Sequence, residues 1–374
     1  MYDVVVVGQG LTGLLSAIWT KKKGHSVALV SQGTGKIIQS SGVMDLSPGK
    51  EEQENTLAKP ALLNKSVEKF KDLTSRLGYP YQGNLQNQVP IVTGSGYVKM
   101  TTLYPETITP VPKTGNVVIV GFQEITDFQP EYIKGNLQKE RPELTIDAIT
   151  VRLGKSSLRT MTQLDAARLL EQKEIRSSVI QQIKSKMSEQ SIKQPKLFVF
   201  PASLGVGQWR TVLSDFRDSL GSAITEAPGM PPNVTAIRLN DVLVKEAVRT
   251  GIRFYTDTIV AGSNLERNQV QSLVVKSTGK TSNLEGLNFI IAGGGVLGGG
   301  LEVTAEGLKE QILRLEVDEF GQYVDCPRNV FPVGASQGTK VTQYGVTGGI
   351  YSILSSYEVQ LKFEESFARG IKHA

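Results

Sequence analysis

The chain opens on a short apolar strand that leads directly into a glycine-rich turn, and this feature constrains the fold most. Residues 2–7 read YDVVVV, the pattern of a strand buried on both faces. The turn GQGLTG follows at 8–13, and apolar residues then recur at helical spacing until three lysines and Gly24 end the helix. A second apolar run at 27–30 predicts the next strand. Glycines placed between a strand and a helix, in a βαβ unit of about 30 residues, predict a dinucleotide-binding turn.

Each glycine of this turn has an expected task. Gly8 allows the tight turn, Gly10 lets a pyrophosphate approach the backbone, and Gly13 lets the helix and the strand pack closely. The N–H groups at the start of the helix, around Leu11 and Thr12, have no partners within the helix and favour an anion. The longer pattern, with a small residue at 17, is typical of flavin proteins more than of nicotinamide proteins. The alternative is a glycine turn that binds no ligand.

The carboxylate that usually binds the adenosine ribose is missing. It is expected about 20 residues after the turn, at the end of the second strand. Ser31 and Gln32 stand there instead, and Lys36 follows. Either the adenosine ribose is held differently, or the bound nucleotide lacks that part, as FMN does. The sequence therefore predicts a flavin and leaves the choice between FAD and FMN open.

A loop of small and polar residues, QSSGVMD at 39–45, comes next. Small residues let the backbone approach a flat ring, and hydroxyl groups can form hydrogen bonds with ring heteroatoms. Ser40, Ser41 and Gly42 are therefore candidates for flavin contacts, although an ordinary turn has the same composition.

The middle of the chain reads as an inserted domain. It follows a stretch rich in Pro, Gly, Glu, Gln and Lys, which predicts an exposed loop at 47–60. Helical patterns occur at 66–77, 164–170 and 175–187, and strand patterns at 89–103, 116–121, 144–153 and 196–200. We therefore expect an α/β protein with a Rossmann-like two-dinucleotide flavin-binding fold and an inserted α+β cap domain. The flavin-binding domain comprises 1–60 and 231–374, and the cap or substrate-side domain comprises 61–230.

The last third of the chain is expected to return to the cofactor. Small residues at strand ends let the chain pass close to a flavin, and a helix N-terminus aimed at the ring would stabilise negative charge on the reduced pyrimidine end. The candidate contacts in this part are Ile259, Val260, Ala292, Gly293, Gly294, Gly334, Ala335, Gly345, Val346 and Thr347. The alternative for the final segment is a plain C-terminal helix.

Composition excludes several classes of protein. The 374 residues carry a net charge of +5 without the basic and aromatic pattern of nucleic-acid binding. Cys326 is the one cysteine, so no disulfide framework or iron–sulfur ligand set is expected, and two histidines predict no metal site. No apolar run is long enough to span a bilayer, and we expect no signal peptide before the first strand. The expected compartment is the cytoplasm.

Residues for substrate chemistry are harder to find. Lys99, Arg159 and Arg238 are weak candidates for anchoring a small anionic substrate, because cations of this kind bind phosphate. Taken alone, each of them is more often a structural or surface residue than a substrate anchor. Oxidation of an alcohol needs a base, and neither His25, at the entry of the second strand, nor His373, near the chain end, is well placed for that role.

Seven stretches, spread over nearly the whole chain, resemble the family of B subunits of anaerobic glycerol-3-phosphate dehydrogenase. They are GQGLTGLL (8–15), SSGVMDL (40–46), VGFQEITDFQ (120–129), FPASLG (200–205), AIRLNDVL (236–243), IIAGGGVLGGGL (290–301) and NVFPVGASQG (329–338). The first and last are general flavoprotein motifs, whereas SSGVMDL and VGFQEITDFQ are more specific. The segment YGVTGGI (344–350) is looser than the family's pattern, and the chain is somewhat short.

The resemblance implies a three-part enzyme of anaerobic respiration. A second, larger flavoprotein subunit would share the oxidation of glycerol 3-phosphate to dihydroxyacetone phosphate, and an iron–sulfur subunit would pass the electrons to membrane quinone. The chain would then lie at the inner face of the cell membrane only through its partners. The family's B subunit is usually described with FMN, which is consistent with the missing ribose carboxylate.

Three functions remain open on the sequence alone. The first is an electron-transferring flavin oxidoreductase subunit that is active only in a complex, because the chain has neither a placed base nor a cysteine cluster. The second is a self-sufficient flavin-dependent dehydrogenase of another small anionic substrate. The third is a scaffold in which the nucleotide is purely structural.

Overall fold

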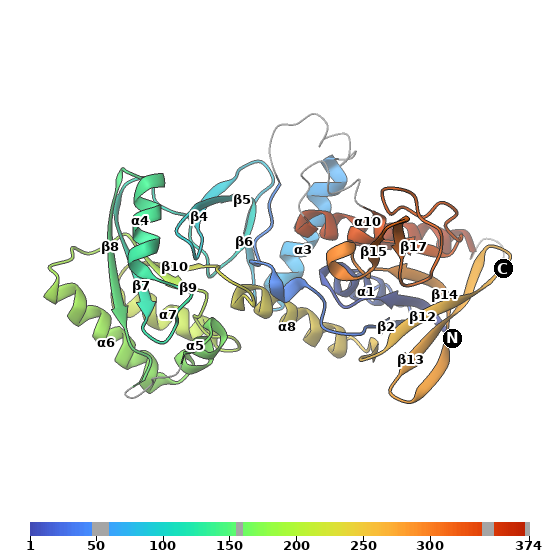
Figure 1. Cartoon of the computed structure of the whole chain (residues 1–374), viewed down its shortest axis with the longest axis horizontal. Helices are drawn as coiled ribbons and strands as arrows, with labels where there is room; N and C mark the ends of the chain where they lie inside the picture. Colours follow the sequence, from blue (N-terminus) through green and yellow to red (C-terminus); the bar gives the residue numbers. More distant parts are fainter. Residues whose placement is uncertain (47–59, 155–159, 339–347, 371–374) are drawn as a thin grey trace. The chain divides into compact units, whose positions relative to one another are not determined.

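A computed structural model of the chain describes residues 1–46, 60–154, 160–338 and 348–370, with the side chains of 366–370 excepted. The chain divides into two compact units (Figure 1). Unit 1 comprises Met1–Ile37, Met44–Gly78 and Asn240–Ala374, and unit 2 comprises Ile38–Val43 and Tyr79–Leu239. The partition differs from the predicted boundaries in that 61–78 lies in unit 1, whereas 38–43 and 231–239 lie in unit 2.

Unit 1 is built on a seven-stranded sheet of order β11-β2-β1-β14-β13-β12, with β17 also paired to β14. Its strands are β1 (Tyr2–Val7), β2 (Val27–Val30), β11 (Arg253–Tyr255), β12 (Ile259–Glu266), β13 (Gln269–Ser277), β14 (Lys280–Ile291) and β17 (Val330–Pro332). The long strand β14 joins two regions of this sheet. Its second half runs parallel to β1 and β17, and its first half runs antiparallel to β13. The parallel part has the arrangement expected of a Rossmann-like fold.

Three helices of unit 1 pack together beside the parallel strands: α1 (Leu11–Lys21), α3 (Pro60–Arg76) and α10 (Gly348–Gly370). Helix α1 is buried along almost its whole length, because it lies between the sheet and α10. The hydroxyl of Ser356 on α10 donates a hydrogen bond to the backbone oxygen of Thr12 on α1, at 3.0 Å. The start of the chain and its last helix are therefore joined in one core.

Unit 2 contains a four-stranded, all-parallel sheet of order β10-β9-β7-β8. The strands are β7 (Gly115–Phe122), β8 (Leu144–Val151), β9 (Leu197–Pro201) and β10 (Ala223–Ala227), and the helices between them are α4 (Pro130–Glu140), α5 (Gln163–Leu170), α6 (Lys173–Glu189) and α7 (Trp209–Leu220). Strand and helix alternate, which is an α/β arrangement. The predicted α+β character holds only for two small antiparallel pairs, β3 (Tyr81–Gly83) with β6 (Leu103–Pro105) and β4 (Val89–Val92) with β5 (Val98–Thr101).

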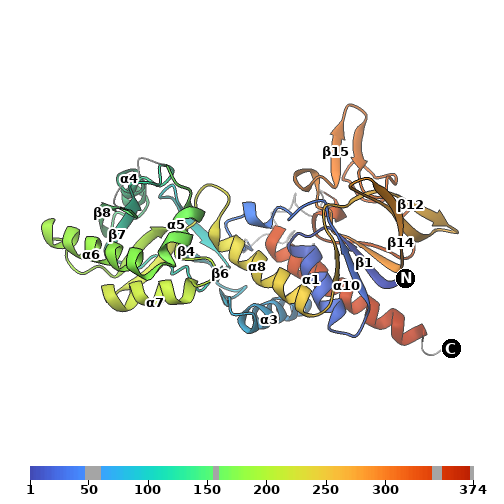
Figure 2. The same cartoon turned by 90° about the horizontal axis from the view of Figure 1, so that it is seen from below.

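The remaining described elements connect these parts or extend from them. Helix α8 (Val234–Arg249) begins in unit 2 and ends in unit 1. Unit 1 also carries a small antiparallel hairpin, which Figure 2 shows extending away from its seven-stranded sheet. The hairpin strands are β15 (Leu301–Thr304) and β16 (Gly307–Glu310), and the short 3-10 turns are η1 (Ile37–Gln39), η2 (Val296–Gly298) and η3 (Gly334–Gln337). Strands β3, β10, β15 and β16 and helices α4 and α7 were not among the predicted elements.

Candidate flavin-binding site

Close packing at the end of β1 requires two of the three motif glycines. Gly8 has a φ of +108°, and its N–H donates to the oxygen of Val30 at 2.8 Å. A Cβ atom on Gly8 would lie 2.2 Å from the backbone oxygen of Ala292, which no side chain can occupy. A Cβ on Gly13 would lie 1.8 Å from the oxygen of Gly8. These two glycines let α1 and the end of β14 close around the turn.

Gly10 is different, because a Cβ atom there would meet no atom within 4 Å. It is the N-cap residue of α1, and because glycine has no side chain it makes no side-chain cap to this helix start. The first turn of α1 also contains no acidic residue. Free backbone N–H groups beside open space, with the positive end of the helix dipole behind them, suit an anionic group. The surroundings of Gly10 therefore fit the phosphate of a flavin nucleotide.

A second chain segment closes against this helix start. A Cβ on Gly334, whose φ is +58°, would lie 2.5 Å from the hydroxyl oxygen of Thr12, so η3 begins in direct contact with α1. The N–H of Gly334 donates to the hydroxyl of Ser355 on α10 at 3.0 Å. The N–H of Gly294 donates to the hydroxyl of Ser336 at 3.1 Å. The structure thus brings three sequence-predicted segments, around Thr12, Gly294 and Gly334, into one region of unit 1.

At the end of β2, where a ribose-binding carboxylate is expected, a hydrogen bond joins Ser31 and Gln9. The hydroxyl of Ser31 donates to the side-chain oxygen of Gln9 at 2.9 Å, and both residues are buried. A Cβ on Gly35, whose φ is +75°, would lie 2.8 Å from both N and Cα of Gly10. The loop that follows β2 therefore lies directly against the glycine turn. Gln9 and Gly35 were not among the predicted residues, although the GTG sequence at 33–35 is a signal for such a close approach.

The other residues predicted to contact the flavin from unit 1 lie near this edge of the sheet or outside the described residues. The N–H of Thr258 donates to the oxygen of Ser31 at 3.0 Å, which brings the start of β12, with exposed Ile259 and buried Val260, beside the end of β2. Ala292 donates its N–H to Val7 at the end of β1. Gln32 is exposed, and Ala335 lies in η3. Gly345, Val346 and Thr347 lie outside the described residues.

The predicted ring loop, Ser40 to Gly42, belongs to unit 2. The oxygen of Ser41 accepts a hydrogen bond from the hydroxyl of Thr235 at 2.8 Å, and the oxygen of Gly42 accepts one from Tyr81 at 2.6 Å. Burial raises the pKa of Tyr81 well above its ordinary value, so this phenol keeps its proton as a donor. The loop is firmly held, and its part in flavin binding stays a prediction.

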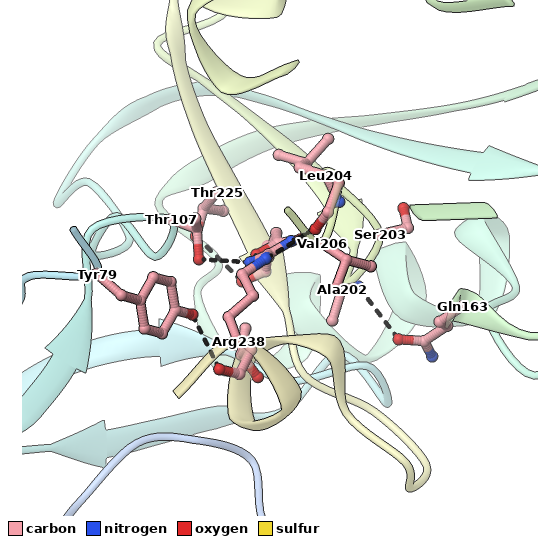
Figure 3. A network of polar contacts seen from close by, with 12 residues as sticks. Tyr79, Thr107, Gln163, Ala202, Ser203, Leu204, Val206, Thr225 and Arg238 are labelled. Carbon is pink, nitrogen blue, oxygen red and sulfur yellow. Dashed lines mark hydrogen bonds and ion pairs between the residues drawn. The ribbon is translucent and has the colours of Figure 1, made fainter. Parts of the chain in front are cut away.

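The structure corrects the interpretation of Arg238 as a substrate anchor. Its guanidinium is 1% exposed and pairs with Glu226, with a shortest contact of 2.6 Å, and it also donates to the oxygen of Gly205 (Figure 3). Although burial alone would lower the pKa of Arg238, the carboxylate of Glu226 raises it. Glu226 in turn accepts the N–H of Leu204 at 2.7 Å. Arg238 therefore holds the loop after β9 in place and has no free face for a substrate.

The remaining candidates gain no chemical role. Lys99 lies on β5 in unit 2 and is half-buried, and Arg159 lies outside the described residues. His25 precedes β2, near Asp3 at the amino end of β1. The glycine turn is at the opposite, carboxyl end of the same strands, so His25 is far from the candidate phosphate position along the sheet. Across the described parts of the chain, no side-chain group is found that could hold a metal ion, and no helix is long and apolar enough to cross a membrane.

Comparison with known proteins supports a flavin-binding chain. The profile of a family described as FAD binding domain matches residues 3–61, which include the glycine turn. Proteins named as the B subunit of anaerobic glycerol-3-phosphate dehydrogenase are similar over most of the chain. The one from Mannheimia succiniciproducens is 23% identical and the match covers 84% of this chain and 79% of the relative. The one from Vibrio vulnificus is 25% identical, with 84% and 78% covered.

The chain is thus similar to these B subunits over most of its length. The cofactor is accordingly a flavin, FAD or FMN, held by a Rossmann-like fold, as the sequence predicted. The relatives place the chain among flavin-dependent oxidoreductases. Among solved structures, a 3-ketosteroid delta1-dehydrogenase from Sterolibacterium denitrificans is 17% identical with a TM-score of 0.36. That match covers 79% of this chain but about half (48%) of the steroid enzyme, and it bears on neither substrate nor site.

Proposed function

We propose that the chain is the flavin-carrying B subunit of an anaerobic glycerol-3-phosphate dehydrogenase complex. In this proposal glycerol 3-phosphate is oxidised to dihydroxyacetone phosphate together with a second, larger flavoprotein subunit. An iron–sulfur subunit passes the electrons to quinone, and the complex lies at the inner face of the cell membrane. The observation that supports the proposal best is the similarity to the B subunits of other organisms, which covers 84% of this chain and nearly four fifths of the relatives.

The flavin would supply a two-electron acceptor, and the residues of this chain would bind and orient it. The N–H groups at the start of α1, beside the open space at Gly10, would hold the phosphate. Thr12 and Gly334 would fix the distance between α1 and η3, because Gly334 leaves no room for a side chain against Thr12. The residues predicted for cofactor contact that no observation tests, among them Ser40, Ile259 and Ala335, are part of this proposal.

We further propose that the nucleotide is FMN. Ser31 uses its hydroxyl on Gln9 where a ribose carboxylate is expected, and Gly35 brings the loop after β2 against Gly10. This arrangement supports a cofactor without an adenosine ribose, although the matching family is described by FAD. The test is the mass of the small molecule that is released when the purified chain is denatured. Release of FAD would contradict the choice of FMN and leave the flavin-binding site intact.

Dependence on a complex is part of the proposal, and the composition of the chain supports it. The chain has a single cysteine, and its histidine near β2 lies at the wrong end of the sheet for a catalytic base. We expect the isolated chain to bind flavin and not to oxidise glycerol 3-phosphate with an artificial electron acceptor. The chain purified together with both companion subunits should do so. Oxidation of glycerol 3-phosphate by the isolated chain would favour the self-sufficient dehydrogenase. In that alternative Arg238 cannot anchor the substrate, because it is paired with Glu226.

A further inference from the structure

Two apolar residues stand exposed in the middle of the glycine-rich segment that follows β14. The segment 293–300 contains six glycines around Val296 and Leu297, which form the turn η2. The side chain of Leu297 is 91% exposed, the largest exposure among the large apolar residues of the described chain. A single exposed leucine is common on protein surfaces, so the surroundings decide whether this one has a function.

The turn that carries Leu297 is held firmly and is joined to the proposed flavin site. The N–H groups of Gly298 and Gly300 both donate to the oxygen of Gly295, at 3.1 and 3.2 Å. A Cβ on Gly300 would lie 2.1 Å from the oxygen of Gly294, so the segment folds tightly on itself. Gly294 is bound through its N–H to the hydroxyl of Ser336 in η3. Leu297 is thus presented a few residues from the loop that we expect beside the cofactor.

The hairpin that follows contacts η2 and carries further exposed apolar residues. Val303 on β15 is 67% exposed, and Val324 in the following loop is 60% exposed. The base of the hairpin is braced by Glu310, whose buried carboxylate accepts the N–H groups of residues 312–314, each at 2.8 Å. Figure 2 shows β15 extending from the sheet of unit 1. An apolar surface on a braced projection needs no large rearrangement before a partner binds it.

The charge of this part is opposite to that of the chain as a whole. The segment 301–325 carries seven acidic residues and two basic ones, whereas the whole chain has a net charge of +5. The acidic residues are Glu302, Glu306, Glu310, Glu316, Asp318, Glu319 and Asp325. Carboxylates around exposed apolar side chains disfavour an anionic lipid surface. They favour a protein surface that carries lysine and arginine side chains at its rim.

We propose that the exposed residues Val296, Leu297, Val303 and Val324, with the exposed carboxylates of Glu302, Glu306, Glu316, Glu319 and Asp325, dock a second redox subunit. That subunit would present an apolar socket bordered by basic side chains. The inference rests on the proposed function, in which electrons must leave the flavin of this chain for a partner. Electron transfer between proteins slows steeply with distance, so the partner has to bind close to the flavin. The docking surface meets this requirement because it continues directly from Gly293–Gly295.

The test uses the chain co-expressed with the larger flavoprotein and the iron–sulfur subunit of the same organism. The variants are Leu297→Arg, Val303→Arg and the double variant, which place positive charge against a basic rim. Val248→Arg is the matched control, since Val248 is a 60% exposed valine on α8 within the same unit. We expect all variants to keep wild-type flavin content. The double variant should bind the companion subunits at least about 30-fold more weakly, and the control should bind as the wild type does.

The outcomes separate this inference from the proposed function. If the wild-type chain binds flavin but assembles with neither companion subunit, the proposed function fails and the docking surface fails with it. If the wild type assembles and the double variant assembles equally well, the docking surface alone is wrong. A Leu297-dependent homodimer of the purified chain, or Leu297-dependent binding to vesicles of anionic phospholipid, would also overturn it. The inference is supported if raised ionic strength weakens assembly of the wild type. This salt dependence should be smaller in a variant that combines Glu302→Gln, Glu316→Gln and Glu319→Gln.

Discussion

Gly8, Gly10 and Gly13 belong to one motif, but their surroundings make different demands on them. Gly8 and Gly13 face backbone atoms of the protein at distances that exclude a Cβ, so they serve the fold. Gly10 faces open space, so the absence of a side chain there leaves room for a ligand to approach the backbone. Substitutions at these positions should therefore separate stability from cofactor binding.

We expect Gly10→Ala to lower flavin affinity by about tenfold or more while the melting temperature of the flavin-free protein stays near wild type. Gly13→Ala should instead destabilise the flavin-free protein by about 1–3 kcal/mol, because the new methyl group overlaps the oxygen of Gly8. Flavin fluorescence titration and urea unfolding measure the two effects. Gly135→Ala on α4, where a Cβ also meets nothing within 4 Å, is the control and should retain full flavin affinity. Equal loss of flavin in Gly10→Ala and in this control would contradict the phosphate position.

Arg238 allows a second test with single substitutions. Removing one partner of a buried ion pair leaves the other charge buried without compensation, which costs about 3–5 kcal/mol. Arg238→Met should lower the free energy of unfolding by about this amount, because Glu226 and the oxygen of Gly205 both lose their guanidinium donor. Arg217→Met, at an exposed arginine of α7, is the matched control. A cost below about 1 kcal/mol would mean that Arg238 is not structural and would reopen its use as a substrate anchor.

At the scale of elements, α1, α3 and α10 meet around a single lysine. The ammonium of Lys69 on α3 lies 4.9 Å from the ring centroids of both Trp19 on α1 and Tyr357 on α10. It also donates a hydrogen bond to Gln360. Burial, and then the positive charge of Lys23, lower the pKa of Lys69 from 10.5 to about 8. Packing between these helices should therefore depend on pH in the alkaline range.

The direction follows from proton binding in the two states. Between about pH 8 and 10.5 the unfolded chain holds the Lys69 proton and the folded chain has released it, so stability rises with pH across this window. We expect the free energy of unfolding of the wild type to increase, relative to Lys69→Met, when the pH is raised from 7.5 to 10. Urea unfolding of both proteins at the two pH values measures the difference. Lys65→Met, at an exposed lysine of the same helix, should leave the pH response of the wild type unchanged. If the free energies of unfolding of the wild type and of Lys69→Met change equally with pH, the pKa of Lys69 is not lowered in the folded protein. The two rings would then keep the ammonium charged.

The elements differ in how far the sequence could predict them. The first strand, turn and helix were predicted because their signals are local: a β-branched run, glycines and helical spacing within 30 residues. Strand β10 (AITEA) was not predicted, because it is five residues long and its buried Glu226 contradicts an apolar strand pattern. That carboxylate is tolerated only because Arg238 reaches it from α8, and such pairing in space leaves no local signal. Helix α7, which was not predicted either, does have a local signal, because its apolar residues recur at helical spacing at 209, 212, 213, 216 and 220.

The candidate site shows the same division. The motif glycines were found from sequence, since each glycine task depends on the chain just before and after it. The hydrogen bond from Ser31 to Gln9 and the approach of Gly35 to Gly10 depend on how the loop after β2 folds back, so they became visible only in three dimensions. The same holds for Ser336 and Ser355, which bind backbone N–H groups of Gly294 and Gly334 from positions distant in sequence.

On the scale of the whole molecule, the chain has two compact units with separate sheets. The open helix start at Gly10 and the contact between Thr12 and Gly334 lie in unit 1, as does the match to the FAD binding domain family except for residues 38–43. The parallel sheet of unit 2 differs at the end of β9. The carboxylates of Glu226 and Glu171 accept backbone N–H groups of the loop that follows this strand. Carboxylates of the chain itself already satisfy these donors, so an added anion has less to gain there.

Flavin binding should therefore stabilise the two units unequally. A ligand that binds only the folded state, present at 100 times its dissociation constant, adds about 2.7 kcal/mol to the stability of the unit that it binds. When FMN is added to the flavin-free chain, we expect slower hydrogen exchange of backbone amides in β1, α1 and the parallel half of β14. Amides of β7 and β9 in unit 2 should exchange at unchanged rates. Exchange followed by mass spectrometry at peptide resolution, with Gly10→Ala as the chain that should show weaker protection at the same FMN concentration, makes the comparison. Protection of β7 and β9 alone would place the nucleotide in the other unit, because slower exchange marks the sheet whose opening the ligand opposes.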